Sequence, residues 1–131
     1  MIGLDTNVLV RFLLRDDPVQ SQKVRDFMNS HCTEASPCLI SSIVLCELAW
    51  VLESCFSYSK HEIHEVLARV LQTSRLRVEN VNAAQAALRD CHKTGADFSD
   101  SLIGRLNRLS ECDYTATFDK RAGRLPMFRI L

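Results

Sequence analysis

The apolar residues at the start of the chain change from a continuous run to a helical spacing. Met1 to Leu4 is a short apolar run, and it stops at Asp5. Thr6 and Asn7, which follow, are short polar residues of the kind that begin helices. The next apolar residues recur at intervals of three or four, as one face of a helix requires: Val8, Leu9, Phe12 and Leu13. The pattern predicts a buried strand that ends at a carboxylate and leads directly into a helix.

Similar patterns predict helices and strands in alternation along the rest of the chain. Helical spacing of apolar residues predicts helices over 19–31, 43–55, 60–74, 82–94 and 98–109. Short apolar or alternating runs predict strands over 38–41, 76–79, 113–118 and, at an edge of the sheet, 128–131. The helix over 43–55 is apolar nearly all round and is therefore expected to be buried. Such alternation is typical of an α/β fold with a mainly parallel central sheet, here of about 4–5 strands flanked by helices.

Composition and charge exclude some classes of protein. A chain of 131 residues is expected to form a single domain, 1–131. Lys plus Arg and Asp plus Glu both number 16, so the net charge is zero and only local clusters could attract nucleic acid. The apolar runs are far shorter than the roughly 18 residues of a membrane span. Asp5 lies where a signal peptide would be apolar, so we expect a cytoplasmic protein.

The cysteines and histidines do not indicate a zinc site. The six cysteines never form a Cys-x-x-Cys pair and lie mostly within apolar patterns, which favours structural thiols over metal ligands. His61 and His64 are three residues apart on a predicted helix, but charged residues flank them. We interpret these histidines as part of a solvated helix face.

Two predicted strands end in a carboxylate. Asp5 follows the first strand and Asp119 follows the strand over 113–118. In open α/β sheets, ligands bind just outside the carboxyl ends of the strands. The alternative for each is ordinary helix capping or turn formation, for which Asp is equally suited.

Glu47 is a single acid within an otherwise apolar segment, 43–52. An unpaired carboxylate that is fully buried would take up a proton or require a cation. Three interpretations therefore stay open: a salt bridge to an Arg, a narrow exposed face of the helix, or a functional acid at the edge of the core.

Asp97 and Asp100 lie three residues apart where the helix over 98–109 begins. Backbone N–H groups at a helix start favour negative charge, so simple capping is again an alternative. If these acids converge with the strand-ending ones, each pair at 4 Å would repel by about 4 kcal/mol at an effective dielectric near 20. A cluster of this kind is expected to bind a cation, and oxygen ligands select Mg²⁺ or Mn²⁺ over zinc.

In order and spacing, these motifs resemble those of PIN-domain ribonucleases, and of VapC-type toxins from bacterial toxin–antitoxin pairs in particular. The resemblance spans Met1 to Leu131 and rests on Asp5-Thr-Asn7, Glu47, Ala96-Asp-Phe-Ser-Asp-Ser-Leu-Ile103 and Thr117-Phe-Asp119. One departure is Leu109-Ser-Glu-Cys112, where many relatives carry Gly before the strand. The resemblance implies an endoribonuclease that depends on Mg²⁺ or Mn²⁺ and hydrolyses RNA phosphodiester bonds with a metal-activated water.

The resemblance also implies roles for individual residues. The catalytic and metal-site acids would be Asp5, Glu47, Asp100 and Asp119, with Asp97 as an accessory metal ligand. Thr6, Asn7 and Thr117 would support the site through hydrogen bonds, although capping and strand propensity explain them equally. Four bases that follow the strand-ending acids are candidates for RNA contact, unless they are a solvated scatter of charge: Arg11, Arg15, Lys120 and Arg121.

The implied partners are an RNA substrate, a cognate antitoxin protein and a second copy of the chain in a homodimer. The segments 19–31, 43–55 and 60–74 carry more apolar surface than a short sheet needs, which is typical of an interface, although a well-filled monomer core is an alternative. Two other functions are considered: a catalytically silent PIN fold that binds RNA or protein, and an aspartyl-phosphate phosphatase. The phosphatase would need a second Asp at position 7, where this chain has Asn7.

Overall fold

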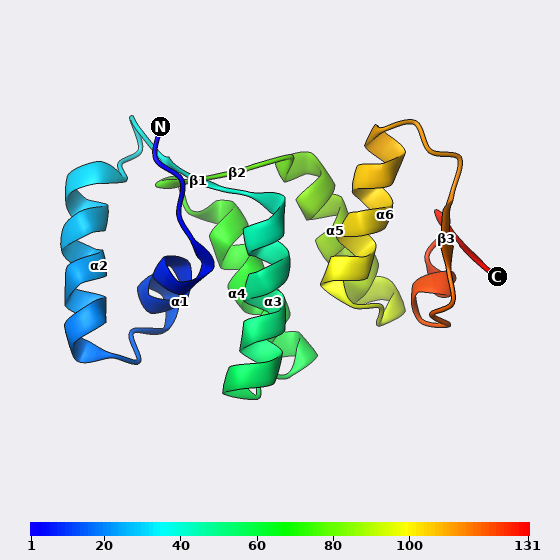
Figure 1. The fold of residues 1–131 in the computed structure, drawn as a ribbon, viewed down its shortest axis with the longest axis horizontal. Coiled ribbons are helices and arrows are strands. Elements are labelled where there is room, and N and C mark those ends of the chain that lie inside the picture. The colour runs from blue at the N-terminus through cyan, green and yellow to red at the C-terminus, as the bar shows by residue number, and fades with distance from the viewer. The chain divides into compact units, whose positions relative to one another are not determined.

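The computed structural model describes residues 1–131, and its helices and strands divide into two units, Met1–Glu79 and Asn80–Leu131 (Figure 1). Each unit is described by itself. None of the helices combines the length and the apolar character that a membrane crossing requires.

Three parallel chain segments form the sheet of the first unit. Strand β1 (Cys38–Ile40) pairs in parallel with β2 (Leu76–Val78). On the other side of β1, Gly3 forms a single parallel bridge with Leu39. The N–H of Leu4 donates to the carbonyl of Leu39 at 3.0 Å, which aligns the first segment with β1. Because all three segments are parallel, the residues that follow them lie at the same edge of this sheet.

The four helices of the first unit each follow a capping residue. They are α1 (Thr6–Leu14), α2 (Pro18–His31), α3 (Ser42–Phe56) and α4 (Lys60–Gln72). Ser41 caps α3, and a reciprocal capping box between Ser59 and Glu62 begins α4. Helix α1 packs against α2 and α3, and α3 packs against α4 (Figure 1). The helices expected over 19–31, 43–55 and 60–74 are confirmed to within one or two residues at each end.

A disulfide joins the end of α2 to the start of β1. Cys32 is the C-cap of α2 and Cys38 is the first residue of β1, and their Cα atoms are 5.2 Å apart. The interpretation of all the cysteines as structural thiols is therefore wrong for this pair. Only the path of the short loop between helix and strand brings the two side chains together, and residue type alone does not specify that path. The other four cysteines form no disulfide.

The second unit is a helix pair followed by a small sheet. Its elements are α5 (Val81–Thr94), α6 (Phe98–Leu109), β3 (Thr115–Thr117), the 3₁₀ helix η1 (Ala122–Arg124) and β4 (Phe128–Ile130). Helix α5 packs along α6. Arg105 of α6 holds Asp90 of α5 with two hydrogen bonds, at 2.6 and 2.8 Å. A bidentate pair of this kind fixes both the distance and the orientation of the two helices.

Gly104 allows α6 to approach the segment that leads into β4. A Cβ atom at this position would lie 2.5 Å from Cε2 of Phe128 and 2.7 Å from Cγ of Met127.

Glu111 has a φ of 63°, in the left-handed region that glycine adopts most easily. Glu111 lies within Leu109-Ser-Glu-Cys112, the segment that departs from the expected motif.

The strands form two small sheets instead of one central sheet of 4–5 strands. β1 pairs with β2, and β3 pairs with β4, in parallel in both cases. The mixed α/β character and the parallel pairing are as expected, while the size of the sheet is not. The local pattern locates each strand, but it does not specify which strands pair, because pairing joins residues far apart in the chain.

Candidate active site

Asp5 lies at the end of the first parallel segment and caps helix α1. Its backbone is extended, and its Oδ1 accepts a hydrogen bond from the N–H of Thr6 at 2.7 Å. Asp5 is exposed, and its second oxygen, Oδ2, makes no hydrogen bond within the chain. Capping is thus one role of Asp5, and the cap leaves one carboxylate oxygen open for a ligand.

Thr6 brings Glu47 to the same place. The Thr6 side chain is buried, and its hydroxyl donates to Oε2 of Glu47 at 2.9 Å. One threonine therefore contacts two acids, Asp5 through its backbone N–H and Glu47 through its hydroxyl. The packing of α1 against α3 places these residues together, although 41 positions separate Thr6 from Glu47.

Glu47 belongs to an exposed stripe of α3. Ile43 is 71% exposed and Trp50 is 64% exposed, and Glu47 lies between them at helical spacing on the same face. The expectation that this helix is buried nearly all round is wrong, because its surroundings cover only part of its apolar surface. Glu47 forms no ion pair with an Arg or Lys. Of the three interpretations, the structure favours the exposed face over the salt bridge.

Within the second unit, Asp97 and Asp119 both lie within electrostatic range of Asp100. Asp97 is the N-cap of α6, and Asp100 lies in the first turn of the same helix. Burial, followed by repulsion from Asp119 and then from Asp97, raises the pKa of Asp100 above its ordinary value. No Lys or Arg forms an ion pair with Asp100. A half-buried carboxylate that is repelled by two others favours binding of a cation.

Asp119 is held by a tight turn after β3. Its Oδ1 accepts hydrogen bonds from the N–H groups of Arg121 at 2.7 Å and Ala122 at 3.2 Å, which begin η1. Its own N–H donates to Oγ1 of Thr117 at 3.0 Å. Thr117 therefore supports the turn through a hydrogen bond, and Oδ2 of Asp119 stays without a hydrogen bond in the chain.

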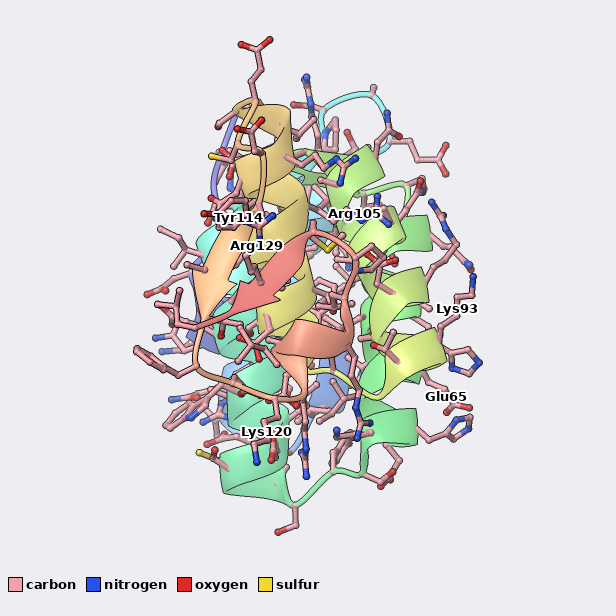
Figure 2. The ribbon with its side chains drawn as sticks, turned by 90° about the vertical axis from the view of Figure 1, so that its right-hand side faces the viewer. Glu65, Lys93, Arg105, Tyr114, Lys120 and Arg129 are labelled. Carbon is pink, nitrogen blue, oxygen red and sulfur yellow. A yellow bond between two sulfur atoms is a disulfide. The ribbon has the colours of Figure 1, made fainter.

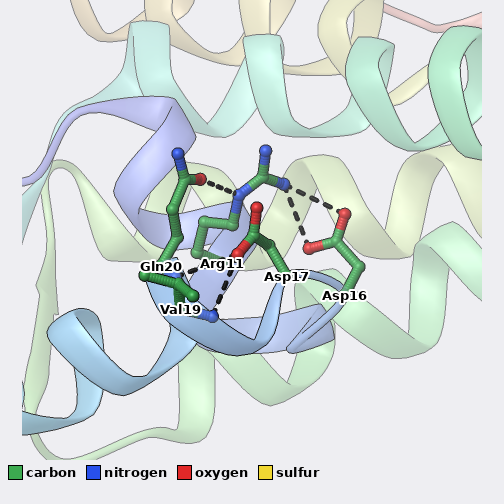
Figure 3. A network of polar contacts seen from close by, with 5 residues as sticks. All are labelled: Arg11, Asp16, Asp17, Val19 and Gln20. Carbon is green, nitrogen blue, oxygen red and sulfur yellow. Dashed lines mark hydrogen bonds and ion pairs between the residues drawn. The ribbon is translucent and has the colours of Figure 1, made fainter.

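The other residues that the sequence suggested for the site differ in whether their side chains already have partners in the chain. Asn7 is exposed, and its side chain makes no hydrogen bond within the chain. The guanidinium of Arg11 is bound to both carboxylate oxygens of Asp16 at 3.0 Å and to Gln20 at 2.5 Å (Figure 3). Arg11 is thus engaged in joining α1 to the start of α2. The remaining bases, Arg15, Lys120 and Arg121, are exposed and form no ion pair.

Glu79 supports helix α3, a role that was not predicted from the sequence. It follows β2 directly, and its Oε1 accepts a hydrogen bond from the N–H of Ser42, the first residue of α3, at 3.0 Å. The carboxylate therefore helps to position the helix that carries Glu47. The sequence contained the signal, because Glu79 ends a strand as Asp5 and Asp119 do.

The chemistry of these residues fits a hard divalent cation. The candidate donors are carboxylate and hydroxyl oxygens, which suit Mg²⁺ or Mn²⁺ better than zinc. The repulsion that acts on Asp100 is of the kind that a cation relieves. No group of three or more His, Cys, Asp or Glu side chains is arranged as a complete metal site. Asp5 and Glu47 belong to the first unit, and Asp97, Asp100 and Asp119 belong to the second.

Comparison with known proteins agrees with the resemblance in the motifs. A family model described as PIN domain matches residues 2–126, which is nearly the whole chain. No curated protein and no solved structure matches significantly.

Proposed function

This chain belongs to the PIN domain family, and we propose that it is a divalent-metal-dependent endoribonuclease, the toxin of a VapBC-type toxin–antitoxin pair. PIN domains are generally nucleases, which act on nucleic acid by hydrolysis. The observation that carries the proposal is the half-buried Asp100 at the start of α6, whose pKa is raised by burial and then by repulsion from Asp119 and Asp97. Asp100 has no ion-pair partner to relieve this repulsion, and such a carboxylate suits a site that binds a cation.

We assign Mg²⁺ or Mn²⁺ to Asp5, Glu47, Asp100 and Asp119, with Asp97 as an accessory ligand. When bound, such an ion supplies an activated water and neutralises negative charge on the phosphate. The chain's own contribution is to orient the carboxylates. Thr6 holds both Asp5 and Glu47, and the turn from Thr117 to Ala122 holds Asp119.

Each strand-ending acid has one oxygen engaged by backbone N–H groups and the other open. In Asp5 and in Asp119 the engaged atom is Oδ1. This division fixes the orientation of the carboxylate without consuming its capacity to bind a ligand. It explains how the same residue can serve both as a cap and as a site acid.

The primary test is cleavage of mixed RNA by the purified chain. We expect EDTA to abolish cleavage and Mg²⁺ or Mn²⁺ to restore it. Asp5→Asn and Asp100→Asn should each abolish cleavage while the protein stays folded by circular dichroism. Glu53→Gln, which changes an exposed acid elsewhere on α3, is the control and should cleave normally. Binding of RNA without cleavage under every metal condition would instead support a catalytically silent PIN fold.

A second test asks whether the two acid sets serve one reaction. The Mn²⁺ affinity of Asp5→Asn, of Asp100→Asn and of the double variant can be measured by titration calorimetry. If both acids bind the same ion, the losses in binding free energy are non-additive. Fully additive losses, or loss in only one variant, would contradict the shared assignment.

We propose two protein partners, a second copy of the chain and an antitoxin. The exposed Ile43 and Trp50 of α3 support an apolar contact between copies. We expect a dimer by light scattering at micromolar concentration, and Trp50→Glu should weaken it. The acids would favour an antitoxin segment that carries Arg or Lys, since a guanidinium pairs bidentately with a carboxylate. Inhibition by that partner should weaken in Asp5→Asn and Asp119→Asn.

A further inference from the structure

Phe118 is the most exposed large hydrophobic side chain in the structure. It is 82% exposed, and it lies between Thr117 and Asp119 at the end of β3. Its ring makes no contact with another aromatic ring or with a cation. Single exposed apolar side chains are common on protein surfaces. Phe118 differs because its open ring lies next to an acid of the proposed site, where a flat apolar surface suits binding of a base.

The exposure follows from a well-defined backbone. Along β3, Thr115 and Thr117 are half-buried while Ala116 is exposed, so Phe118 continues the outward-facing register. The turn that follows is held by the hydrogen bonds of Asp119 to Thr117 and to the start of η1. The ring is therefore presented outward by structured chain on both sides.

The residues beyond Asp119 add positive charge beside the ring. Lys120 and Arg121 are both exposed and form no ion pair. Lys120 is labelled in Figure 2. An open aromatic ring accompanied by unpaired bases is the combination that binds single-stranded nucleic acid, the ring by stacking on a base and the bases by contacting phosphates.

We propose that Phe118 stacks on an unpaired nucleobase of the RNA substrate and positions the strand beside Asp119. This inference rests on the proposed function and deepens it, because it assigns a base-binding role to a residue outside the set of acids. Base stacking on an aromatic side chain tolerates any base, so Phe118 contributes affinity and position without strict sequence selection.

A neighbouring aromatic residue provides a contrast. Tyr114 is also exposed in part, but the guanidinium of Arg129 lies 3.8 Å from its ring centroid (Figure 2). That face of the Tyr114 ring is already covered by a cation–π contact. Of the aromatic residues next to β3, only Phe118 therefore has an uncovered ring beside an acid of the site.

The test measures RNA binding by Phe118 variants in the Asp100→Asn background, with a fluorescein-labelled 12-nucleotide random-sequence RNA and a matching abasic oligomer. Phe118→Ala should weaken binding of the RNA by about 5- to 150-fold, the range that loss of one stacked base predicts. Phe118→Tyr should restore most of the affinity. The abasic oligomer, which has phosphates but no bases, should bind equally to all three proteins.

The matched control is Leu109→Ala, because Leu109 is also an exposed apolar residue but lies at the opposite end of α6 from Asp100. It should leave the RNA affinity unchanged. A direct readout is Phe118→Trp in a Trp50→Phe background, whose fluorescence should be quenched by the RNA and not by the abasic oligomer.

Three results would overturn the inference. The first is an RNA affinity in Phe118→Ala equal to that of the parent. The second is an equal loss of affinity for the RNA and for the abasic oligomer. The third is dissociation of a dimer by Phe118→Ala in light scattering, which would make the ring a protein contact. If any of these occurs while Asp100→Asn still abolishes cleavage in the otherwise unaltered chain, the proposed nuclease function stands without Phe118 stacking. If the unaltered chain neither binds nor cleaves RNA, both proposals fail.

Discussion

The hydroxyl of Thr6 donates a hydrogen bond to Oε2 of Glu47 at 2.9 Å, while the N–H of the same threonine donates to Oδ1 of Asp5 at 2.7 Å. A single buried residue thus helps to position two carboxylates, one on the N-cap of α1 and one on α3. Residues that orient metal ligands in this way commonly affect metal binding almost as much as the ligands do.

Thr6→Val removes the hydroxyl but retains the backbone donor and nearly all of the side-chain volume. We expect Mn²⁺ affinity to fall about 10- to 100-fold, and the free energy of unfolding to fall by only about 1 kcal/mol for the lost hydrogen bond. Thr6→Ser, which keeps the hydroxyl, should restore the affinity. Titration calorimetry and chemical denaturation measure the two quantities, and normal Mn²⁺ affinity in Thr6→Val would contradict this role.

Glu47→Gln separates a functional acid from a structural one. Because Glu47 is exposed and has no ion pair, we expect the stability to change by no more than about 0.5 kcal/mol. Metal-dependent cleavage should nevertheless be lost, whereas Glu53→Gln should retain it. A stability loss of about 3–5 kcal/mol would be the sign of a buried ion pair. That loss, together with intact Mn²⁺ binding, would exclude our assignment.

Asp100 should make stability depend on pH in a defined direction. Burial, with repulsion from Asp119 and Asp97, raises its pKa above 3.8. The folded protein then holds the proton of Asp100 more tightly than the unfolded chain does. The stability that comes from this bound proton is fully present below the unfolded pKa and is lost as the pH rises through the folded pKa. In EDTA at neutral pH, we expect Asp100→Asn to have a larger free energy of unfolding than the unaltered protein. Near pH 3 this difference between the two proteins should be smaller. An equal difference at both values would contradict the raised pKa.

Lys120 and Arg121 are expected to contact RNA phosphates. Replacing both with Glu should weaken RNA binding and lower the slope of log affinity against log salt by about one for each phosphate contact removed. Arg89→Glu combined with Lys93→Glu makes the same change in net charge at exposed positions of α5 and serves as the control. Equal salt slopes in the two double variants would place the RNA path elsewhere.

Gly104→Ala tests the close packing in the second unit. The added methyl group would lie 2.5 Å from the ring of Phe128, so one of the two elements must shift. Overpacking of this kind costs about 1–3 kcal/mol, which should exceed the gain of up to about 1 kcal/mol from better helix propensity. A fall in melting temperature is therefore expected. Arg108→Ala, at an exposed position of the same helix, should leave it nearly unchanged.

Much of the local structure was determined by the sequence itself. The apolar spacing predicts α2, α5 and α6 nearly to the residue, because helical periodicity and capping depend on neighbours within four positions. Asp5 and Asp119 could be identified as strand-ending acids for the same reason, and the structure places each at the end of a paired segment with one oxygen open.

The tertiary structure decided what depends on distant residues. The hydrogen bond of Thr6 to Glu47, the support that Glu79 gives to α3, and the exposed face of Ile43 and Trp50 all depend on which elements pack together. The pairing of strands into two small sheets and the disulfide of Cys32 with Cys38 depend on the path of the chain. A residue's neighbours along the chain specify its conformation, but its burial, pKa and partners come from groups that only folding brings near.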